Sequence, residues 1–447
     1  MHSIRTNGSA TDKRDIIRRA EERSVRFVRL SFVDILGVTK SVTIPAADLE
    51  RALDGRVSFD GGSIDGFVRG EEADMMLVPD PATFAIESST SSGVVEARLI
   101  CDVALPDGEP FEGCPRKVLR RAIEDARDVT AGIVTALEVE FYLFDVDDDG
   151  RPNWTSSDAG SYFDIDETGR GEAARLEIAR SLEAMGVAVA SAHHEHGAGQ
   201  HEIDLCDADP LAAADALVTV RTVAKRIAVK HRLHATFMPK PSETLAGSGL
   251  HAYFALPAET AAASPGAGEI SEEALYAIGG LLRHAPAFTA ICNPTVNSYK
   301  RLVAAWDAPI YAVWSRRSAN SLVRVPGTQQ ARPRMEVRSP DASCNPYLAM
   351  AVLLASLADG LREATLPGDP LVGSTYDLSA RDRERLRIRT LPKSLRQALE
   401  ELGGDAIVRG ALGDHVYQAF RDAKLAEYER YRRAVHAWER DAYLRVY

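Results

Sequence analysis

The chain is poor in cysteine, has no excess of basic residues and contains no long apolar run. Its 447 residues include five cysteines and no Cys-x-x-Cys pair, which argues against a disulfide framework or a zinc cluster and is typical of a reducing compartment. The formal net charge of −12 disfavours nucleic acid as a partner, because phosphate backbones attract basic surfaces. The longest weakly polar run, residues 343–358, contains an asparagine and a proline and is shorter than the roughly 20 apolar residues of a membrane span.

Several common motifs are also missing. The first 15 residues contain no apolar segment of the secretory type, so we expect a cytoplasmic protein with no membrane partner. The chain has no GxxxxGK[ST] phosphate loop, no GxGxxG after a strand and no HExxH. Residues 247–249 (GSG) lack the spacing of a nucleophile elbow. These absences argue against P-loop ATPases, Rossmann dehydrogenases and the common hydrolases.

The pattern of the chain changes near residues 106–115, which are rich in proline, glycine and acidic residues. Before them, residues 25–34 and 38–45 read as strands, the first with the alternation of a half-buried strand, and residues 1–14 have the composition of a disordered tail. After them, strands are interleaved with long helices. We therefore predict an α+β fold. A β-rich domain is expected over 15–110, and a larger domain of helices around a mostly antiparallel sheet over 111–447.

Individual helices are predicted from apolar periodicity. The C-terminal residues 415–447 read as one long helical segment, and their aromatic side chains are expected to dock on a second surface such as another subunit. The other long helices are predicted over 116–129, 172–185, 210–231, 273–290 and 347–364.

Acidic residues stand inside otherwise apolar strands. Glu138 and Glu140 are two apart in ALEVEFYLF, so on a strand they share one face while Leu137, Val139 and Phe141 take the other. Two buried carboxylates side by side are unfavourable unless a cation lies between them. The alternative is an edge strand with a solvated acidic face.

Further acidic and histidine residues extend this set. Residues 193–204 (HHEHGAGQHEID) bring Glu195 and Glu202 together with four histidines. The histidines would suit zinc, but a carboxylate-rich set suits Mg²⁺ or Mn²⁺ better. In the segment MEVR, Glu336 shares a strand face with an arginine, and His251 is either a satisfied core histidine or another ligand.

Four arginines complete the candidate chemistry. A guanidinium group is a bidentate donor suited to carboxylate or phosphate. Carboxylates for two cations together with clustered arginines are the equipment of phosphoryl transfer. The arginines are Arg301, Arg324, Arg334 and Arg338.

Seven short segments are specific in both sequence and order. They are FDGGSIDGF (59–67), LEVEF (137–141), HHEHGAGQHEID (193–204), TFMPKP (236–241), GSGLH (247–251), NPTVNSYKRL (293–302) and MEVRSPD (335–341). Together they resemble glutamine synthetase of the bacterial and archaeal type I family, and the resemblance covers residues 15–447.

This resemblance implies an N-terminal β-grasp domain, a C-terminal catalytic domain and an ATP-dependent reaction. In that family the γ-carboxylate of glutamate attacks the terminal phosphoryl group of ATP, and an amine then attacks the resulting γ-glutamyl phosphate. Two divalent cations, Mg²⁺ or Mn²⁺, are implied as well. Their ligands would be Glu140, Glu195 and Glu202 for one ion, and Glu138, His251 and Glu336 for the other.

The resemblance also assigns residues to the two larger substrates. Arg324 and Arg334 match phosphate- and nucleotide-binding arginines, and Tyr253 occupies a position on the ATP side. The glutamate-binding set would consist of Gly247, Arg301 and Arg338.

The amine site and the assembly are implied in the same way. Asp60 matches a carboxylate that a neighbouring subunit supplies to bind and deprotonate ammonium, and Asp74 and Tyr162 match further members of that pocket. Family members form dodecamers of two stacked hexameric rings, with each site shared between two subunits. The C-terminal helix would hold the rings together.

Two departures from the family pattern lie at the amine side. The flap that normally reads Tyr-Glu-Ala-Pro is residues 306–309 (WDAP), so the proton-accepting carboxylate is Asp307, one methylene shorter. A misplacement of about 1 Å can reduce a rate roughly a hundredfold. The usual Asn-Arg-Ser motif aligns with residues 318–320, which places Ala319 where an arginine steadies the intermediate; Arg316 or Arg317 could substitute for it.

Three interpretations follow. Because both departures open space beside the amine pocket, we favour a ligase for an organic amine such as a polyamine or ethanolamine. The first alternative is a standard glutamine synthetase that uses ammonia, and the second is a retired paralogue with a regulatory role. Two residues that match regulatory positions in some relatives, Tyr376 and Arg69, are interpreted as a plain surface tyrosine and a solvated arginine.

Overall fold

The computed structural model describes residues 12–64, 66, 74–87, 93–154, 156–166, 169–257, 270–305, 307–327 and 334–447. Arg69, Trp306 and residues 1–11 of the predicted tail lie outside this part. The first helix, α1 (Lys13–Glu22), begins within the predicted tail of residues 1–14, because the Asp12 side chain accepts a hydrogen bond from the backbone N–H of Arg14 and caps the first turn.

The N-terminal sheet has the strand order β2-β1-β6-β4-β3, with β5 paired to β6. In β1, Val28, Leu30 and Phe32 are buried as the alternation predicts, and Ser31 and Val33 on the other face are buried too, Val33 within the hydrophobic core of the larger domain. The strands are β1 (Phe27–Val33), β2 (Thr39–Pro45), β3 (Val57–Asp60), β4 (Asp74–Pro79), β5 (Ala85–Glu87) and β6 (Glu96–Ala104), with α2 (Leu49–Leu53) between β2 and β3.

The second sheet has the order β12-β13-β14-β11-β7-β9-β8, with β10 paired to β7. Every pairing in it is antiparallel except β12 with β13, in agreement with the prediction. Its strands are β7 (Val134–Asp145), β8 (Val189–His194), β9 (Gln200–Leu205), β10 (Leu233–Thr236), β11 (Leu250–Ala255), β12 (Trp314–Ser315), β13 (Val323–Arg324) and β14 (Met335–Val337).

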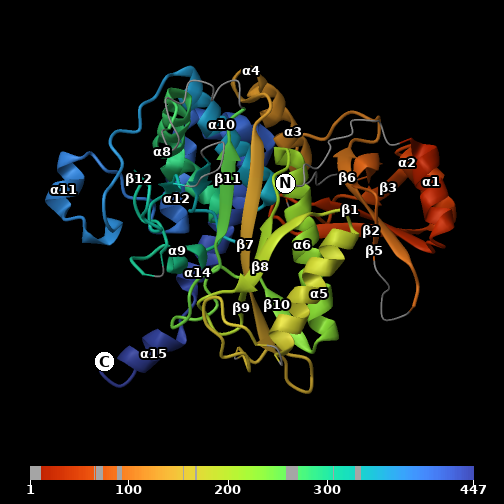
Figure 1. The fold of residues 1–447 in the computed structure, drawn as a ribbon, viewed down its shortest axis with the longest axis horizontal. Coiled ribbons are helices and arrows are strands. Elements are labelled where there is room, and N and C mark those ends of the chain that lie inside the picture. The colour runs from red at the N-terminus through yellow and green to blue at the C-terminus, as the bar shows by residue number, and fades with distance from the viewer. Residues whose placement is uncertain are drawn as a thin grey trace.

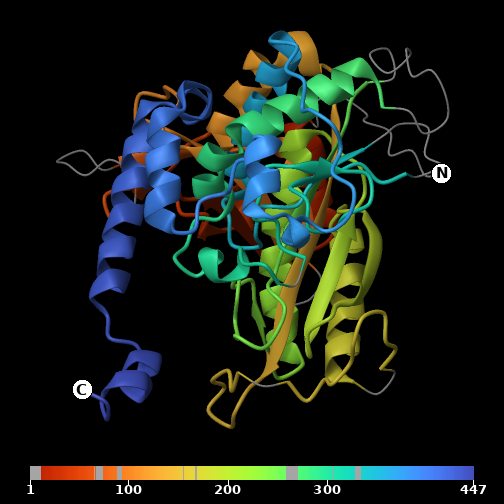
Figure 2. The same ribbon diagram turned by 90° about the vertical axis from the view of Figure 1, so that its left-hand side faces the viewer.

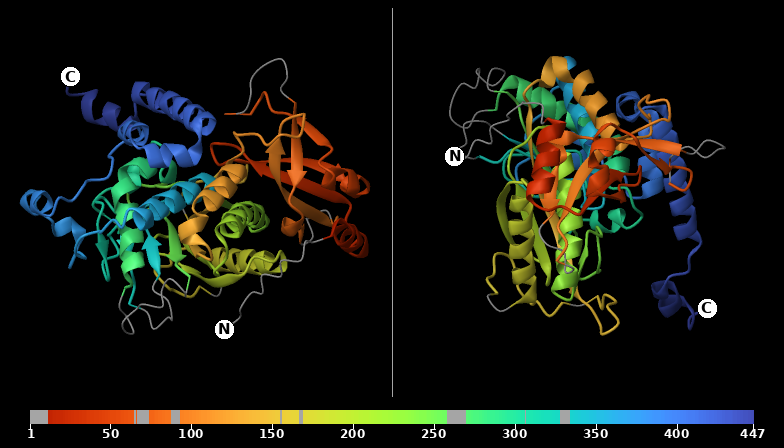
Figure 3. Two further views of the ribbon diagram at one scale, coloured as in Figure 1. Left: turned by 90° about the horizontal axis from the view of Figure 1, so that it is seen from above. Right: turned by 90° about the vertical axis from the view of Figure 1, so that its right-hand side faces the viewer.

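Helices pack against one face of this sheet, and the acidic residues of β7 lie on the other. Leu137, Val139 and Phe141 of β7 belong to one continuous core with residues of α6, α8 and α10, so the intervening glutamates face the opposite side. Figure 1 shows β7 as the long central strand, and Figure 3 shows the N-terminal sheet beside the helical part. The helices are α3 (Pro115–Asp125), α4 (Arg127–Thr130), α5 (Arg170–Ala184), α6 (Pro210–Lys230), α8 (Glu272–Cys292), α9 (Ser298–Arg301), α10 (Pro346–Arg362), α11 (Ala380–Arg385), α12 (Leu395–Gly404) and α13 (Ala406–Leu412).

The C-terminal segment differs from its prediction. It forms two helices, α14 (Asp414–Arg433) and α15 (Ala437–Tyr443), instead of one. The backbone turns extended at Ala434, and His436 begins α15 with a reciprocal capping box to Glu439. Figure 2 shows α15 projecting from the body, and Trp438 is 66% exposed. In the described part of the chain, no helix is both long and apolar enough to cross a membrane.

Candidate active site

Strand register brings the acidic residues together. In β7, Glu138 lies opposite His251 of β11 on one side and Asp204 of β9 on the other. Glu140, two residues on, lies opposite Glu202. Since residues two apart share a face of a strand, the carboxylates of β7 and β9 and the imidazole of β11 converge on the face of the sheet opposite the helical core.

These side chains line a pocket of about 410 Å³. Its other walls come from the loop after β7, the segment before β11, and residues near β13 and β14. The predicted site residues found in its lining are Glu138, Glu140, Tyr162, Glu195, Glu202, Gly247, His251, Tyr253, Arg301, Asp307, Arg324 and Arg338.

One predicted ligand set converges directly. Nδ1 of His251 is 3.1 Å from Oε2 of Glu138 and 3.7 Å from Oε1 of Glu336. Each of the three residues offers one ligand atom, and these atoms all lie within 4.8 Å of one another. Glu336 is fully buried, so its charge requires cationic partners.

The three residues of the other predicted set, Glu140, Glu195 and Glu202, do not form one group of ligand atoms. Glu202 groups with Glu140 and His251, and also with His193 and Glu195. Glu140 accepts hydrogen bonds from the Gln200 amide at 3.0 Å and from a backbone N–H at 2.9 Å. His193, one of the four histidines noted in the sequence, is 3.2 Å from Glu202 through Nε2. Glu202 is therefore the carboxylate shared by both groups.

Electrostatics favour a cation at this place. Burial and the surrounding carboxylates raise the pKa of Glu202 well above its usual value, and burial raises the pKa of Glu138. Burial, with Arg338 nearby, lowers the pKa of His251 to about 3, so its imidazole is neutral and keeps a lone pair. Carboxylate oxygens with a neutral imidazole suit a hard or borderline divalent ion. The residues present therefore fit divalent metal binding.

Asp204 is a pocket residue that was not predicted from the sequence. It lines the pocket and groups with Glu138 and Glu202, and burial with the nearby Glu138 raises its pKa. The signal was present in the segment HEID, where Glu202 and Asp204 are two apart, as Glu138 and Glu140 are. Gln200 and Phe163 are further pocket residues that no sequence pattern singled out.

The zinc alternative is not favoured for the two remaining buried histidines. His194 and His201 lie beside Asp158, with Nε2 of His194 3.0 Å from Oδ1 of Asp158. Arg175 is 3.1 Å from Nδ1 of His201. Since a guanidinium only donates, Nδ1 accepts and the proton of His201 resides on Nε2, which lies 3.5 Å from Oδ2 of Asp158. Asp158, His194 and His201 are close enough to form a ligand group, but with one nitrogen accepting from Arg175 and the other protonated, His201 offers no free lone pair to a metal ion.

The arginines surround the same pocket, with one exception. Arg301 is buried and donates to the carbonyl oxygens of Ser339 and Arg338 at 2.9 and 3.1 Å. Arg324 and Arg338 both pair with Glu336. Arg334 instead pairs with Asp207 at 2.6 Å and is absent from the pocket lining. Gly247 is close to Arg301, since a Cβ there would meet Cγ of Arg301 at 2.7 Å.

Two predicted amine-site residues lie elsewhere in the chain. Asp60 and Asp74 are directly opposite each other on β3 and β4 of the N-terminal sheet. Neither is among the pocket-lining residues. The single chain therefore brings Tyr162 and Asp307 to the pocket but not this pair.

The interpretation of Tyr376 as a plain surface residue is wrong. Its side chain is half-buried, and its hydroxyl lies 2.8 Å from the carbonyl oxygen of Ala308. Burial, together with the charge of Asp307, raises the pKa of Tyr376 to about 12.

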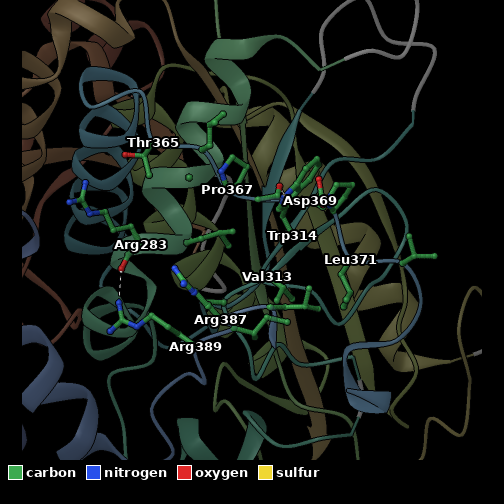
Figure 4. A pocket seen from close by; sticks show the side chains of 18 residues that line it. Arg283, Val313, Trp314, Thr365, Pro367, Asp369, Leu371, Arg387 and Arg389 are labelled. Carbon is green, nitrogen blue, oxygen red and sulfur yellow. Dashed lines mark hydrogen bonds between the residues drawn. The ribbon is translucent and has the colours of Figure 1, made fainter. Parts of the chain in front are cut away.

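A second cavity, of about 460 Å³, lies between α8 and residues 365–372 and 386–389 (Figure 4). Arg283, Arg387 and Arg389 border it, but Asp369 is the single carboxylate among the described lining residues. It therefore lacks the clustered carboxylates of the first pocket.

Comparison with known proteins agrees with this fold and site. The model of the glutamine synthetase catalytic domain matches residues 112–443, and that of the glutamine synthetase beta-grasp domain matches residues 24–106. Glutamine synthetase of Thermus thermophilus is 45% identical over 443 residues, which are 97% of this chain and 99% of the relative. Glutamine synthetase of Halobacterium salinarum is 43% identical over 450 residues, which are 98% of this chain and 99% of the relative.

Solved structures give the same answer. A complex of GmaS with ADP superimposes with a TM-score of 0.84 at 29% identity, covering 96% of this chain and 99% of that one. GmaS without ligand gives 0.83 at 31% identity, covering 97% and 99%. The chain therefore belongs to the glutamine synthetase family. It is an ATP-dependent glutamate ligase of that family.

Proposed function

We propose that this ligase joins the γ-carboxylate of glutamate to an organic amine through γ-glutamyl phosphate. The observation that carries the proposal is the pocket itself, which carboxylates, an imidazole and arginines line together with Asp307 and Ala319. Acidic groups suited to cations beside arginines suited to anions match the needs of phosphoryl transfer between two anionic substrates.

The metal ligands would be those implied by the family resemblance. Mg²⁺ or Mn²⁺ bound there would neutralise phosphate charge and orient the transferred group. The close group of His251, Glu138 and Glu336 supports one ion. Glu140, Glu195 and Glu202 would hold the other, with Glu202 already near both Glu140 and His193.

The arginines would bind the anionic substrates. Arg301 and Arg338 would bind the glutamate carboxylates beside Gly247, and Arg324 would bind phosphate. Tyr253 lines the pocket and would form the wall on the ATP side. Arg334 would contact the nucleotide only by leaving its partner Asp207.

The chemistry of the amine step would belong to Asp307. An amine attacks the acyl carbon of γ-glutamyl phosphate only as its neutral form, so its ammonium form must first lose a proton. The carboxylate of Asp307 lines the pocket and would accept that proton. Ala319 would leave space at the position where the family pattern has an arginine. Tyr162 and Phe163 also line the pocket and would offer apolar surface to a carbon chain.

Ammonia is the second candidate acceptor. It is favoured by the presence of Asp60, Asp74 and Tyr162 and by the similarity to proteins named glutamine synthetase. Asp60 and Asp74 lie outside the pocket of their own chain, so they could take part in binding the amine only at the pocket of a neighbouring subunit. We propose a dodecamer of two hexameric rings for this reason, with the exposed aromatic side chains of α15 as a contact between rings.

Amide formation by the purified protein tests the proposal. Product would be followed with ATP, glutamate and Mg²⁺ or Mn²⁺ while the amine is varied across ammonium, methylamine, ethanolamine, putrescine and spermine. The proposal requires one organic amine to exceed ammonium in kcat/KM by about tenfold, which corresponds to about 1.4 kcal/mol of transition-state preference. A preference for ammonium would identify a glutamine synthetase, and no product with any amine would favour the regulatory interpretation.

A further inference from the structure

The hydroxyl of Tyr376 is hydrogen-bonded to the backbone of the segment that carries Asp307, the proposed proton acceptor. It lies in the 3₁₀ turn Thr375–Asp377, and its hydroxyl is 2.8 Å from the carbonyl oxygen of Ala308 and 3.3 Å from that of Ala305. These two carbonyls lie on either side of Asp307. The backbone of Asp307 has φ 57°, a left-handed conformation that is unfavourable for a residue with a side chain. Such a conformation persists only where surrounding contacts hold it.

Hydrogen bonds from the side chain of Asn320 hold the 3₁₀ turn that carries Tyr376. The Asn320 amide donates to the hydroxyl of Ser374 at 3.0 Å, and its Oδ1 accepts from the backbone N–H of Thr375 at 3.0 Å. Ser318 donates its hydroxyl to the same Oδ1 at 2.7 Å. Asn320 is buried, so both ends of its amide are used away from bulk water.

This connection joins the two places where the sequence departs from the family pattern. Ala319, which precedes Asn320, and Asp307 both line the pocket. Alanine has no polar atom with which to reach the flap. Asn320 instead reaches the flap indirectly, through Ser374, Thr375 and Tyr376.

We propose that Asn320 and Tyr376 are positioning residues, forming a hydrogen-bonded bridge that holds the Asp307 carboxylate at the pocket wall for the amine step. The inference rests on the proposed role of Asp307 in taking the proton of the amine. Neither residue is in the pocket lining, so both act through the flap backbone.

The electrostatics of the site are consistent with this bridge. Burial and the charge of Asp307 keep the Tyr376 hydroxyl protonated, since they raise its pKa to about 12, while Arg301 and Arg338 act in the opposite direction. A hydroxyl that keeps its proton remains a donor to the carbonyl of Ala308. Loss of one such bond should shift the local opening equilibrium of the flap by about three- to tenfold.

Hydrogen exchange of the assembled protein tests the bridge without requiring turnover. Tyr376→Phe and Asn320→Ala should speed amide exchange in residues 303–309 by about three- to tenfold, and the double variant should add little to either. Tyr311→Phe is the matched control, because the described hydrogen bond of the Tyr311 hydroxyl is accepted from Arg383 and not made with the flap backbone. Exchange in β7 and α6 should be unchanged in all variants, which shows that the fold persists. Unchanged exchange at 303–309 in both single variants would overturn the bridge.

Kinetics test its effect on the reaction. In Tyr376→Phe we expect KM for ATP to be unchanged, kcat for amide formation to fall about three- to tenfold and the ratio of phosphate released to amide formed to rise, since a displaced Asp307 slows the amine step. Equal losses in Tyr376→Phe and Tyr311→Phe would overturn the positioning role. If the wild-type protein forms no amide, the proposed function fails, whereas the exchange result still decides whether the bridge exists.

Discussion

Glu138 and His251 are opposite each other on β7 and β11, and Nδ1 of His251 lies 3.1 Å from Oε2 of Glu138. The other ring nitrogen, Nε2, is 3.7 Å from Oε1 of Glu140. One imidazole therefore stands between two carboxylates that are two residues apart on the neighbouring strand. The ring groups with Glu138 and Glu336 and also with Glu140 and Glu202. It therefore lies between the two proposed metal positions.

Removing this ring should abolish metal-dependent activity. We expect His251→Asn to lower Mn²⁺ affinity and amide formation by more than about a hundredfold, since mutation of even the supporting partners of metal ligands costs 10–100-fold. Calorimetric titration with Mn²⁺ measures the first effect. His234→Asn, at an exposed histidine of β10, is the control and should bind Mn²⁺ normally. Full activity of His251→Asn would contradict the assigned ligand set.

Asp204 should have opposite effects on the metal-free and metal-bound protein. It adds a negative charge beside Glu138 and Glu202, and like charges in a buried site disfavour one another. Asp204→Asn should therefore raise the melting temperature in the presence of a chelator and lower the affinity for Mn²⁺. Thermal unfolding with EDTA and with excess Mn²⁺ measures both. A lower melting temperature with EDTA would show that Asp204 has a different role.

Ala319→Arg tests the choice of amine. The substituted guanidinium would extend into the pocket that Asp307 also lines, so it should hinder a bulky amine more than ammonium. We expect the ratio of kcat/KM for the preferred organic amine to that for ammonium to fall by about tenfold, a difference of about 1.4 kcal/mol. Ala246→Ser, a small polar change elsewhere in the same pocket, is the control. An unchanged ratio would remove Ala319 as a determinant of amine size.

The stability of the catalytic domain should depend on pH through His284. Its ring on α8 lies 2.7 Å from Asp405 and 2.9 Å from Asp359 of α10, with Arg283 also near Asp359. Burial acts to lower the pKa of His284, but the two carboxylates outweigh it and raise the pKa above its ordinary 6.5. A raised folded-state pKa contributes stability that is complete below the unfolded value and is lost as pH rises through the folded value. The free energy of unfolding should therefore fall above pH 6.5 in the wild type, and less so in His284→Gln. Identical pH profiles would contradict this assignment.

Local spacing was enough to predict much of this architecture. Helices expected over 210–231 and 347–364 are α6 (Pro210–Lys230) and α10 (Pro346–Arg362), because long apolar stretches with capping residues define such elements. The shared face of Glu138 and Glu140 was predictable from a two-residue period alone. The family resemblance supplied the grouping of these residues with His251 and Glu336.

Contacts between distant segments were not predictable in this way. The hydroxyl of Tyr376 reaches a carbonyl 68 residues earlier in the chain, and no periodicity reports such a contact. The position of Asp204 beside Glu138 depends on the register between β7 and β9, which is set by the whole sheet. The break between α14 and α15 depends on a cap at His436, a residue type that does not ordinarily signal one.

The most direct test of the proposed γ-glutamyl phosphate route follows one oxygen atom of glutamate. If the γ-carboxylate of glutamate attacks ATP, one of its oxygens becomes the bridge to phosphorus and leaves with phosphate when the amine attacks the acyl carbon. Turnover of glutamate labelled with ¹⁸O in the γ-carboxylate would be followed by mass spectrometry of the released phosphate, with any productive amine. The account predicts one ¹⁸O transferred per phosphate for each amide formed, and unlabelled phosphate alongside amide product would contradict it.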